Sequence, residues 1–566
     1  MARLRAWRGR RRVSPLWTVA VALIVAVMVL PIIAIGVIAL GAEDGIWARL
    51  FSAPTRNAAW RTVLLMSGVG SLTLVIGTGT AWLVTMYRFP WRNRLDWMLV
   101  IPLAMPTYII AFCYVEILDY SGFAQTALRQ TFGWSSVRDY WFPEVRSLGG
   151  AVFVMSFVLY PYVYLSARAS FLQQSVCTLE VARTLGQTAL GTFWRVALPL
   201  ARPALAAGVT LALMECLNDI GAVEYLGVRT LTVRVYTTWL ERSSLGSAAQ
   251  LAGLMLSFIL ILLVLERFAR SGRRFHHTTG RYRAMPPTKL KGARALLATI
   301  ACTVPLAIGF LIPVAALVQD SVVFAGDALT ERFWRAALNS LLLGGLAAGT
   351  AVAFALVLAY ARRVAPNGFT RPAVGLAGLG YAVPGTVLAV GVLIPLAGFD
   401  NWFDGLMRAH FGVSTGLMLS GSLFAILLAY TIRFMAIALG ALDAGLGRIS
   451  PSLDAAARTL GQSVLGTLKR IHMPLLQSAI GTAALLVFVD AMKELPATLL
   501  LRPFNFETLA THVYDFASLE QFEEAAIGAL AIVAIGLVPV ILLHRAVASG
   551  RAGGPAVPVA PSDLNG

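Results

Sequence analysis

Two stretches of this 566-residue chain have nearly the same sequence, and their recurrence decides the fold. The first is EVARTLGQTALGTFWRVALPL, residues 180–200, and the second is AAARTLGQSVLGTLKRIHMPL, residues 455–475. All shared positions recur at one offset of 275 residues, which chance does not produce. Self-similarity at a fixed spacing is the signature of an internal repeat. The identical pairs include Arg183/Arg458, Gly186/Gly461, Gln187/Gln462, Gly191/Gly466, Arg195/Arg470 and Pro199/Pro474.

The chain around the two copies is strongly apolar. Hydrophobic residues make up 58% of it and charged residues only 13%, about half the charged fraction of a soluble domain. A helix that spans a membrane needs about 20 mostly apolar residues, and twelve stretches satisfy this criterion. They are 16–41, 60–86, 97–118, 149–171, 203–224, 247–266, 295–318, 336–361, 373–397, 415–440, 476–494 and 525–545.

The twelve predicted spans divide into two sets of six that correspond to each other. Thr62 matches Ser340 and Pro106 matches Pro384, both at an offset of 278. Six is an even number, so the two repeats run parallel and are related by an axis along the membrane normal. We therefore predict an all-α polytopic membrane protein built from two parallel six-helix repeats. The expected divisions are a first half at 1–266, a basic cytoplasmic linker at 267–294, a second half at 295–548 and a disordered tail at 549–566.

The charge of the chain indicates its orientation. Of 46 basic and 28 acidic residues, seven polar segments that alternate with the spans hold 31 basic but only 6 acidic ones. Cytoplasmic loops of membrane proteins carry this excess, so the net charge of +18 requires no nucleic-acid partner. Both termini are predicted to be cytoplasmic. The segments are 1–15, 87–96, 168–202, 266–294, 362–371, 443–472 and 545–566.

Each repeated motif lies on the predicted cytoplasmic side, between the fourth and fifth spans of its half. It is expected to form a helix from about Glu180, a turn that Gly186 permits because it lacks a Cβ, and a second helix closed by Pro199. Such a helix pair can dock into a groove of a cytosolic partner. The alternative is a hairpin that merely links two spans, but its presence in both halves favours two docking sites.

The pattern E-x-A-x-x-x-G followed by F and L-P resembles the coupling loop of permease subunits in binding-protein-dependent ABC importers. The second copy departs from the pattern, because Ala455 stands at the Glu position and Asp454 lies one residue earlier. The stretch KELPATLLLRPF, residues 493–504, further resembles the double-length iron(III) permeases. The resemblance implies these ATPase-coupling residues: Glu180, Ala182, Arg183, Gly186, Pro199, Asp454, Ala457, Arg458, Gly461 and Pro474.

The resemblance implies an importer subunit of the bacterial inner membrane that is not itself an enzyme. No G-x-x-x-x-G-K-[ST] sequence occurs in the chain, so the phosphate-binding loop of an ATPase is absent. ATP and Mg would be bound by two separate cytosolic nucleotide-binding subunits, and this chain itself would bind no cofactor. The other implied partners are a periplasmic substrate-binding protein and the lipid bilayer.

Four acidic residues lie inside predicted spans, where a charge is costly and is by default a sign of function. Glu215 and Asp219 in the fifth span recur as Asp490 and Glu494 at the offset of 275. Each pair is spaced i, i+4, so both carboxylates lie on one helix face. We predict that the four line the substrate pathway, where they would transiently bind a hard metal cation. Alternatively, Glu494 pairs with Lys493, or these acids mark helix ends among lipid headgroups.

The leading hypothesis is an ATP-driven importer that moves iron(III) from periplasm to cytoplasm by alternating access. Import of thiamine or another cation by the same kind of permease is the nearest alternative, because an acidic pathway suits an organic cation too. A secondary transporter with two parallel six-helix halves would explain the hydropathy equally well. It would not explain the duplicated cytoplasmic helix pair.

Overall fold

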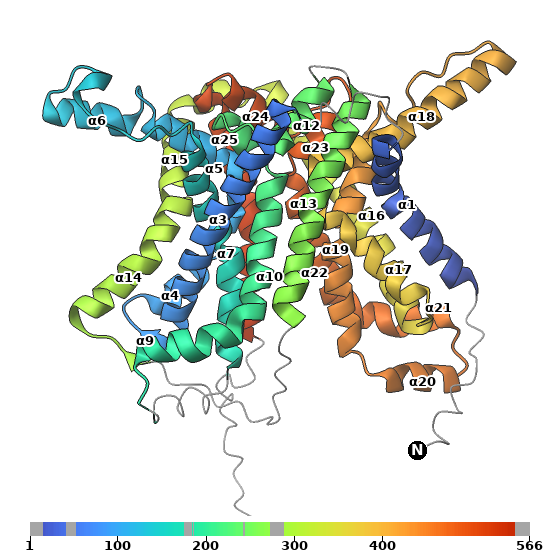
Figure 1. Cartoon of the computed structure of the whole chain (residues 1–566). Coiled ribbons are helices and arrows are strands. Elements are labelled where there is room, and N and C mark those ends of the chain that lie inside the picture. Colours follow the sequence, from blue (N-terminus) through green and yellow to red (C-terminus); the bar gives the residue numbers. More distant parts are fainter. Residues whose placement is uncertain are drawn as a thin grey trace, which may run out of the picture.

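The computed structural model describes residues 15–40, 52–174, 184, 186–240, 244–271 and 288–549, and within these ranges the chain is a bundle of long helices (Figure 1). Eleven of the described helices are long and apolar enough to span a membrane, and one bent helix pair raises the number to as many as twelve. The predicted all-α class is therefore confirmed. Apolar side chains exposed along these helices face lipid, since the membrane core is as apolar as they are.

The helices follow the predicted order in both repeats. In the first, they are α1 (Pro15–Leu40), α3 (Ala53–Met86), α4 (Arg92–Met98), α5 (Thr107–Leu118), α6 (Phe123–Phe132), α7 (Leu148–Gln173), α9 (Ala189–Thr192), α10 (Leu198–Asn218), α11 (Gly221–Tyr225), α12 (Leu231–Leu240) and α13 (Leu245–Ser271). In the second, they are α14 (Gly292–Leu306), α15 (Ile312–Ala328), α16 (Glu331–Val364), α17 (Thr370–Ala377), α18 (Gly385–Phe411), α19 (Leu423–Arg448), α20 (Pro451–Thr459), α21 (Val464–Thr467), α22 (Met473–Met492), α23 (Pro496–Leu501), α24 (Leu509–Ser518) and α25 (Phe522–Ser549).

Shorter elements connect these helices. Three π-helical segments continue directly into the helix that follows each of them: η3 (Phe193–Ala197), η4 (Ala307–Leu311) and η6 (Leu468–His472). The 3₁₀ turns are η1 (Ile101–Ala104), η2 (Val137–Asp139) and η5 (Gly378–Ala382). Two short strands, β1 (Tyr87–Arg88) and β2 (Thr288–Lys289), pair in parallel.

The third span of each half is broken at a proline. In the first half the chain bends by 93° between α4–η1 and α5, and Pro106 there is extended with ψ of 142°. In the second half Pro384, with ψ of 144°, separates η5 from α18. Proline cannot donate a helical hydrogen bond and disfavours helix at the residue before it. The continuous spans predicted at 97–118 and 373–397 are therefore wrong, although the equivalence of Pro106 and Pro384 holds.

The duplication extends to individual hydrogen bonds. Thr62 Oγ1 accepts a bond of 3.0 Å from the backbone N–H of Leu231, at the start of α12. In the second half, Ser340 Oγ accepts one of 2.7 Å from the N–H of Leu509, at the start of α24. The two hydroxyl residues, Thr62 and Ser340, are 278 residues apart, and so are the two donors, Leu231 and Leu509. In each half, the first backbone N–H groups of a helix have no partner within that helix. A hydroxyl on the second span accepts one of them, at the equivalent helix in both halves.

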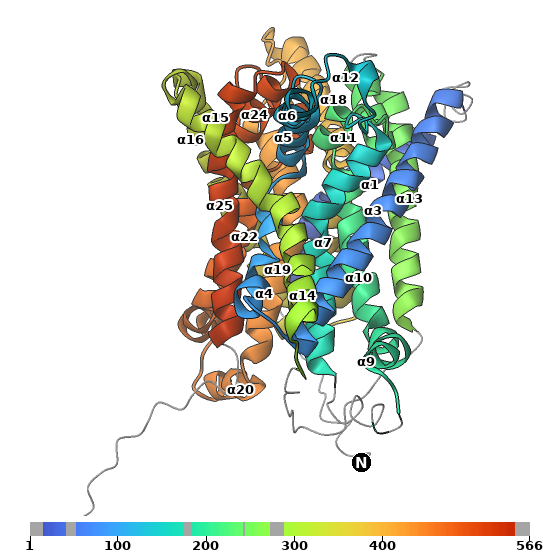
Figure 2. The same ribbon diagram turned by 90° about the vertical axis from the view of Figure 1, so that its left-hand side faces the viewer.

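The first span of each repeat packs on the opposite repeat. Helix α1 lies against α17 and α18 of the second half as well as α13 of the first, and α15 contacts both α25 and α5 (Figures 1 and 2). The Trp17 and Tyr360 rings meet edge to face at 5.3 Å, and Tyr114 donates a 2.8 Å hydrogen bond to the Ile308 carbonyl. The predicted halves are therefore sequence repeats that interlock in space. Of the predicted linker 267–294, residues 272–287 lie outside the described ranges, as does the tail from Gly550.

The contact between α1 and α18 leaves no room for a side chain at Gly391. A Cβ there would lie 2.7 Å from the Pro31 carbonyl oxygen. We expect Gly391→Ala to destabilise the protein by about 1–3 kcal/mol because the two helices must separate. The measurement is thermal unfolding of the detergent-purified chain. Gly398→Ala in the same helix, where a Cβ has no neighbour within 4 Å, should behave as wild type; equal loss in both variants would contradict the close packing.

Candidate functional site

The repeated motifs lie at the end of the bundle that carries α9 and α20 (Figure 1). Both predicted glycine turns have the left-handed backbone that favours glycine, with φ of +80° at Gly186 and +73° at Gly461. Equivalent hydroxyls cap the helix that follows, since Thr188 Oγ1 accepts from Gly191 N at 3.1 Å and Ser463 Oγ from Gly466 N at 3.0 Å. Three predicted coupling residues, Glu180, Ala182 and Arg183, lie outside the described residues.

The second helix of each motif does not end at its proline, contrary to the prediction. Residues 190–218 and 464–492 each form one uninterrupted helical run that enters the membrane. The π-helical segment before Pro199 explains why, because the Leu198 N–H bonds to the Phe193 carbonyl five residues earlier. Pro474 follows the same kind of segment in the second copy. This wider turn accommodates a residue that lacks an N–H, so the second helix of each motif is continuous with the fifth span.

Asp454 is turned toward its own half of the protein. Its Oδ2 lies 2.9 Å from the Arg363 Nε, and its Oδ1 lies 2.7 Å from the His472 Nε2. The same arginine donates to the carbonyls of Leu446 and Ile449, at 2.6 and 3.0 Å. Asp454 therefore fastens α20 to α16 and η6, a role that the sequence pattern does not signal. Beside it Ala457 is buried, whereas Arg458 is exposed and donates to the Asp454 carbonyl at 2.9 Å.

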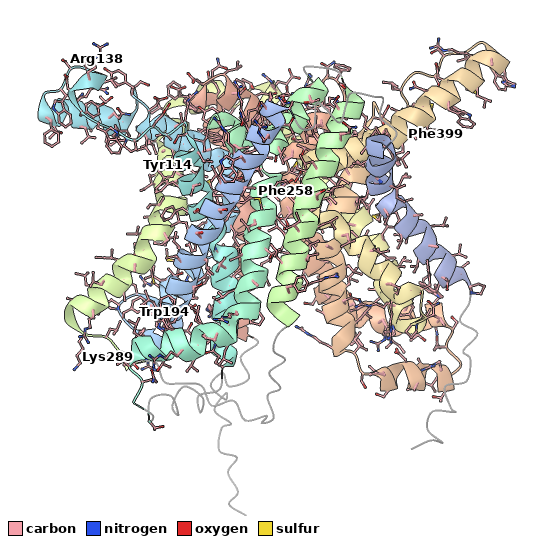
Figure 3. The ribbon with its side chains drawn as sticks, in the orientation of Figure 1. Tyr114, Arg138, Trp194, Phe258, Lys289 and Phe399 are labelled. Atoms are coloured by element: carbon pink, nitrogen blue, oxygen red, sulfur yellow. The ribbon has the colours of Figure 1, made fainter. Side chains whose placement is uncertain are left out.

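Both motifs expose large apolar side chains among their basic residues. Leu460 is 79% exposed and Leu465 is 50% exposed in the second copy. In the first copy Leu190 is 68% exposed, and Trp194, labelled in Figure 3, is 59% exposed. Exposed apolar patches of this kind mark protein or membrane contacts.

The four acids predicted for the pathway line one central cavity between the halves, as the repeat symmetry suggested. Glu215 and Asp219 reach it from the end of α10, and Asp490 and Glu494 from the end of α22. Two cations, Arg433 and Lys493, share the space. The polar lining consists of Thr107, Tyr108, Tyr162, Glu215, Asn218, Asp219, Tyr381, Arg433, Asp490, Lys493 and Glu494.

Two of the four acids form ion pairs. Arg433 Nε lies 3.0 Å from Glu494 Oε2, with both side chains at most 5% exposed. Lys493 Nζ lies 2.9 Å from Asp490 Oδ1. The alternative pairing of Glu494 with Lys493 is therefore wrong. Adjacent residues on a helix point in different directions, whereas the i, i+3 spacing of Asp490 and Lys493 brings them together.

Asp219 and Glu494 also serve as helix caps at equivalent positions. Asp219 Oδ1 accepts from Ala222 N at 2.8 Å, at the start of α11, and Glu494 Oε1 accepts from Ala497 N at 3.2 Å, at the start of α23. Both caps recur at the offset of 275. These two carboxylates are thus partly structural, which leaves Glu215 and Asp490 as the acids that cap no helix.

Two residues of α10 connect the halves across the cavity. Asn218 Oδ1 accepts from Arg433 at 2.9 Å and from the Gly385 N–H at 2.6 Å. Glu215 Oε1 accepts a 2.7 Å bond from the Tyr381 hydroxyl. Every donor belongs to the second half and every acceptor to the first.

The cavity is acidic overall but does not form a metal cage. Four carboxylates face two cations, which leaves an excess of two negative charges when all are ionised. Within the described ranges, no group of three or more His, Cys, Asp or Glu side chains is placed to hold a metal ion. Asp490 and Glu494 are turned toward Lys493 and Arg433 instead. This geometry does not provide the four-carboxylate metal site suggested by the sequence.

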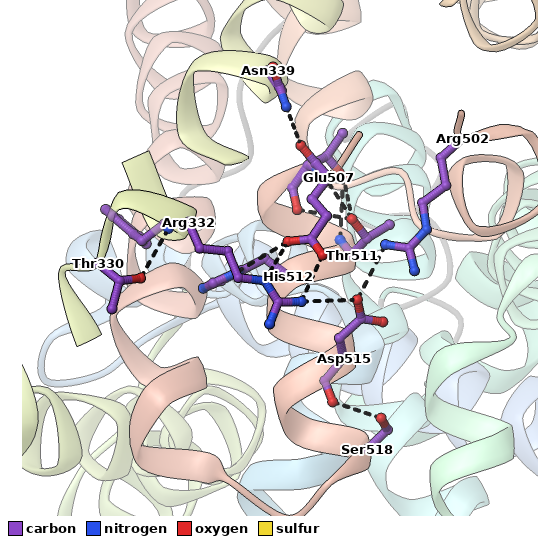
Figure 4. A network of polar contacts seen from close by, with 11 residues as sticks. Thr330, Arg332, Asn339, Arg502, Glu507, Thr511, His512, Asp515 and Ser518 are labelled. Atoms are coloured by element: carbon purple, nitrogen blue, oxygen red, sulfur yellow. Dashed lines mark hydrogen bonds and ion pairs between the residues drawn. The ribbon is translucent and has the colours of Figure 1, made fainter. Parts of the chain in front are cut away.

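A second polar cluster lies around α24, at the end of the bundle opposite α9 and α20 (Figures 1 and 4). Arg332 binds Glu507 through two bonds of 2.7 and 2.8 Å, and Asp515 lies 3.3 Å from Arg502. The hydrogen bonds from Arg332 lower the pKa of Glu507. Burial lowers the pKa of His512, which is only 1% exposed and packs on Phe516.

The lowered pKa of His512 gives the stability of this end a pH dependence. Folding favours the neutral imidazole, so the free energy of unfolding is greatest above pH 6.5, the ordinary pKa of histidine, and falls as the pH drops below it. In thermal unfolding between pH 7.5 and 5, His512→Gln should lose less stability than wild type. His410→Gln, at an exposed position, should keep the wild-type slope; an unchanged slope in His512→Gln would contradict this assignment.

A duplicated bundle of spanning helices around a charged central cavity defines a membrane transport protein. Residues 73–273 match the family described as binding-protein-dependent transport system inner membrane component. The sulfate transport system permease protein of Salmonella typhimurium is 30% identical over 231 residues, covering 38% of this chain and 78% of that protein. The chain belongs to this family of binding-protein-dependent permeases. It is a multi-pass permease subunit of an ABC importer in the inner membrane and not an enzyme.

Two further relatives differ in their named substrates. An Fe(3+)-transport system permease protein of Haemophilus influenzae is 26% identical over 493 residues, covering 86% of this chain and 88% of that protein. The molybdenum transport system permease protein of Escherichia coli is 28% identical over 225 residues, covering 38% of this chain and 95% of that protein. The predicted resemblance to double-length iron(III) permeases is thus confirmed, and the family membership replaces the secondary-transporter alternative.

Proposed function

We propose that this chain forms the pathway of an ATP-driven importer for iron(III). The observation that carries the proposal is the central cavity, where four carboxylates outnumber two cations. An excess of negative charge attracts a small hard cation and repels an anion such as sulfate. The Haemophilus protein named as an Fe(3+) permease supports the same assignment, because it aligns along most of both chains.

Glu215 and Asp490 are the acids proposed to meet the cargo, and Asp490 would have to part from Lys493 to do so. They occupy equivalent positions in the two repeats and, unlike Asp219 and Glu494, cap no helix. Oxygen donors suit iron(III), a hard cation, and transient binding by two carboxylates permits release. A cage of three or four carboxylates would retain the ion, so a pathway needs fewer ligands than a storage site.

Alternating access would use the bonds that cross the cavity. Opening requires the halves to separate between Asn218 and Gly385, and between Glu215 and Tyr381, which are 2.6 and 2.7 Å apart. The Arg433–Glu494 pair belongs wholly to the second half, so it would move as a unit. Each crossing bond is broken and remade in one cycle, and its modest net free energy suits a reversible gate.

The energy would come from two nucleotide-binding subunits that hold ATP and Mg and dock at the α9 and α20 end. The exposed Leu190 and Leu460 are suited to grooves on such partners. Glu180, Ala182 and Arg183 are proposed to complete the first contact. Because the second helix of each motif is continuous with α10 or α22, a force on that helix would be transmitted toward the cavity acids.

The positive-inside rule would place the α9 and α20 end in the cytoplasm together with both termini. The periplasmic substrate-binding protein would then dock at the opposite end, which carries α6 and α24 (Figure 1).

The substrate assignment is tested by uptake of radioactive iron(III) into vesicles containing the complete transporter and its binding protein. We expect Glu215→Gln to lower uptake about tenfold, because it removes the charge but keeps a hydrogen-bond partner for Tyr381. Glu144→Gln, at an exposed position outside the cavity, is the matched control and should transport normally. Thiamine or sulfate uptake without iron uptake would refute the proposal.

The docking role is tested separately, by ATP hydrolysis of the assembled complex. Leu460→Glu places a charge on the apolar contact and should lower substrate-stimulated hydrolysis about tenfold, with little effect on membrane insertion. Leu417→Glu alters another exposed leucine, 61% accessible and distant from α20, and should leave hydrolysis unchanged. Equal hydrolysis by both variants and wild type would contradict docking at this surface.

A further inference from the structure

Two basic segments that lie 201 residues apart in the chain meet at the edge of the bundle. Strands β1 and β2 pair in parallel, with Arg88 directly beside Lys289, and the Leu290 N–H donates to the Arg88 carbonyl at 2.9 Å. Lys289 is labelled at the lower edge of the molecule in Figure 3. Paired residues of neighbouring strands project to the same face about 5 Å apart, so two like charges are held together.

A hollow of about 830 Å³ adjoins this strand pair. Three of its six lining residues are arginines: Arg88, Arg92 and Arg94. Trp91, at the entrance of α4, is 67% exposed and has a left-handed φ of 62°. The Arg94 guanidinium lies over the Trp91 ring at 5.6 Å. The hollow therefore combines cations with an aromatic side chain of the kind found at membrane interfaces.

Arg88, Arg94 and the neighbouring Lys289 have no carboxylate partner among the described residues. Asp96 is the nearest acid in sequence, but Arg168 binds both of its oxygens, at 2.5 and 2.7 Å.

Two arginines near the end of α16 are, by contrast, neutralised by carboxylates. Arg362 lies 2.5 Å from Asp443, and Arg363 lies 2.9 Å from Asp454. Like charges placed opposite each other across strands destabilise the pairing. An external anion would relieve the repulsion between Arg88 and Lys289, which are paired across the strands.

The surroundings of the hollow indicate a lipid anion. Helix α14 starts three residues after Lys289 and packs against α3 and α4. Its next turns expose Leu296, Leu297 and Ile300, which are 60%, 64% and 46% accessible. A phosphate in the hollow would therefore have an apolar surface directly beside it, where acyl chains can lie.

We propose that the hollow lined by Arg88 and Arg94, with Lys289 beside it, binds the phosphate headgroup of an anionic phospholipid. Arginine is well suited to phosphate because its planar guanidinium donates two hydrogen bonds. The lipid would join the loop after the second span to the start of the second repeat. The proposal concerns the outer boundary of the protein and does not depend on which substrate is transported.

The test is titration of the purified full-length chain with phosphatidylglycerol, with bound lipid counted by native mass spectrometry. We expect Arg88→Gln/Arg94→Gln to bind phosphatidylglycerol at least tenfold more weakly, because each basic residue near an anionic lipid contributes substantially to binding. Lys289→Glu should also weaken binding, since it supplies Arg88 with an internal carboxylate. Binding of phosphatidylcholine should not differ between these proteins.

The matched control is Arg371→Gln/Arg448→Gln, which removes two exposed charges from the second half and should bind phosphatidylglycerol as wild type does. Wild-type affinity in both Arg88→Gln/Arg94→Gln and Lys289→Glu would overturn the proposal. Equal loss in the control would also overturn it, because binding would then reflect net charge alone. Displacement of the lipid by millimolar inorganic phosphate would show a general phosphate site instead of a lipid site.

Discussion

The ion pair between Arg433 and Glu494 is the interaction on which the centre of this protein depends. Both side chains are at most 5% exposed, so removing either partner would leave an uncompensated charge in the membrane interior, at a cost of several kcal/mol. Arg433 also donates to Asn218 of the first half, at 2.9 Å. Glu494 caps α23, and its carbonyl accepts a 3.2 Å bond from the buried Tyr430. The pair therefore holds Glu494 at the cavity and, through Arg433, joins it to the first half.

The two repeats share their backbone plan but not their charges. The helix starts bound by Thr62 and Ser340 are equivalent, as are the helix caps formed by Asp219 and Glu494. The offset of 275 nevertheless places Val158 opposite Arg433 and Asn218 opposite Lys493, all within the cavity lining. The first half thus contributes two acids and no cation, whereas each acid of the second half is paired. Duplication preserved the scaffold while the lining diverged.

Much of this arrangement could be predicted from sequence, because hydropathy and a fixed repeat offset depend only on local composition and order. The convergence of Glu215 and Asp490 followed from the offset alone. The partner of Glu494 could not be predicted, since Arg433 lies 61 residues away on another helix and only tertiary packing joins them. The uninterrupted helix through Pro199 was also missed, because a π-helical turn is a backbone adjustment that has no distinctive composition.

The interlocked repeats have a consequence for symmetry. A homodimer of one repeat must present identical side chains on both sides of its axis. Two copies of the first half would surround the cavity with four acids and no cation, and two copies of the second with four acids and four cations. An intermediate balance of four acids and two cations requires two repeats that differ in sequence, as the halves of this chain do. Sequence divergence between the repeats therefore makes available a cavity potential that identical subunits cannot produce.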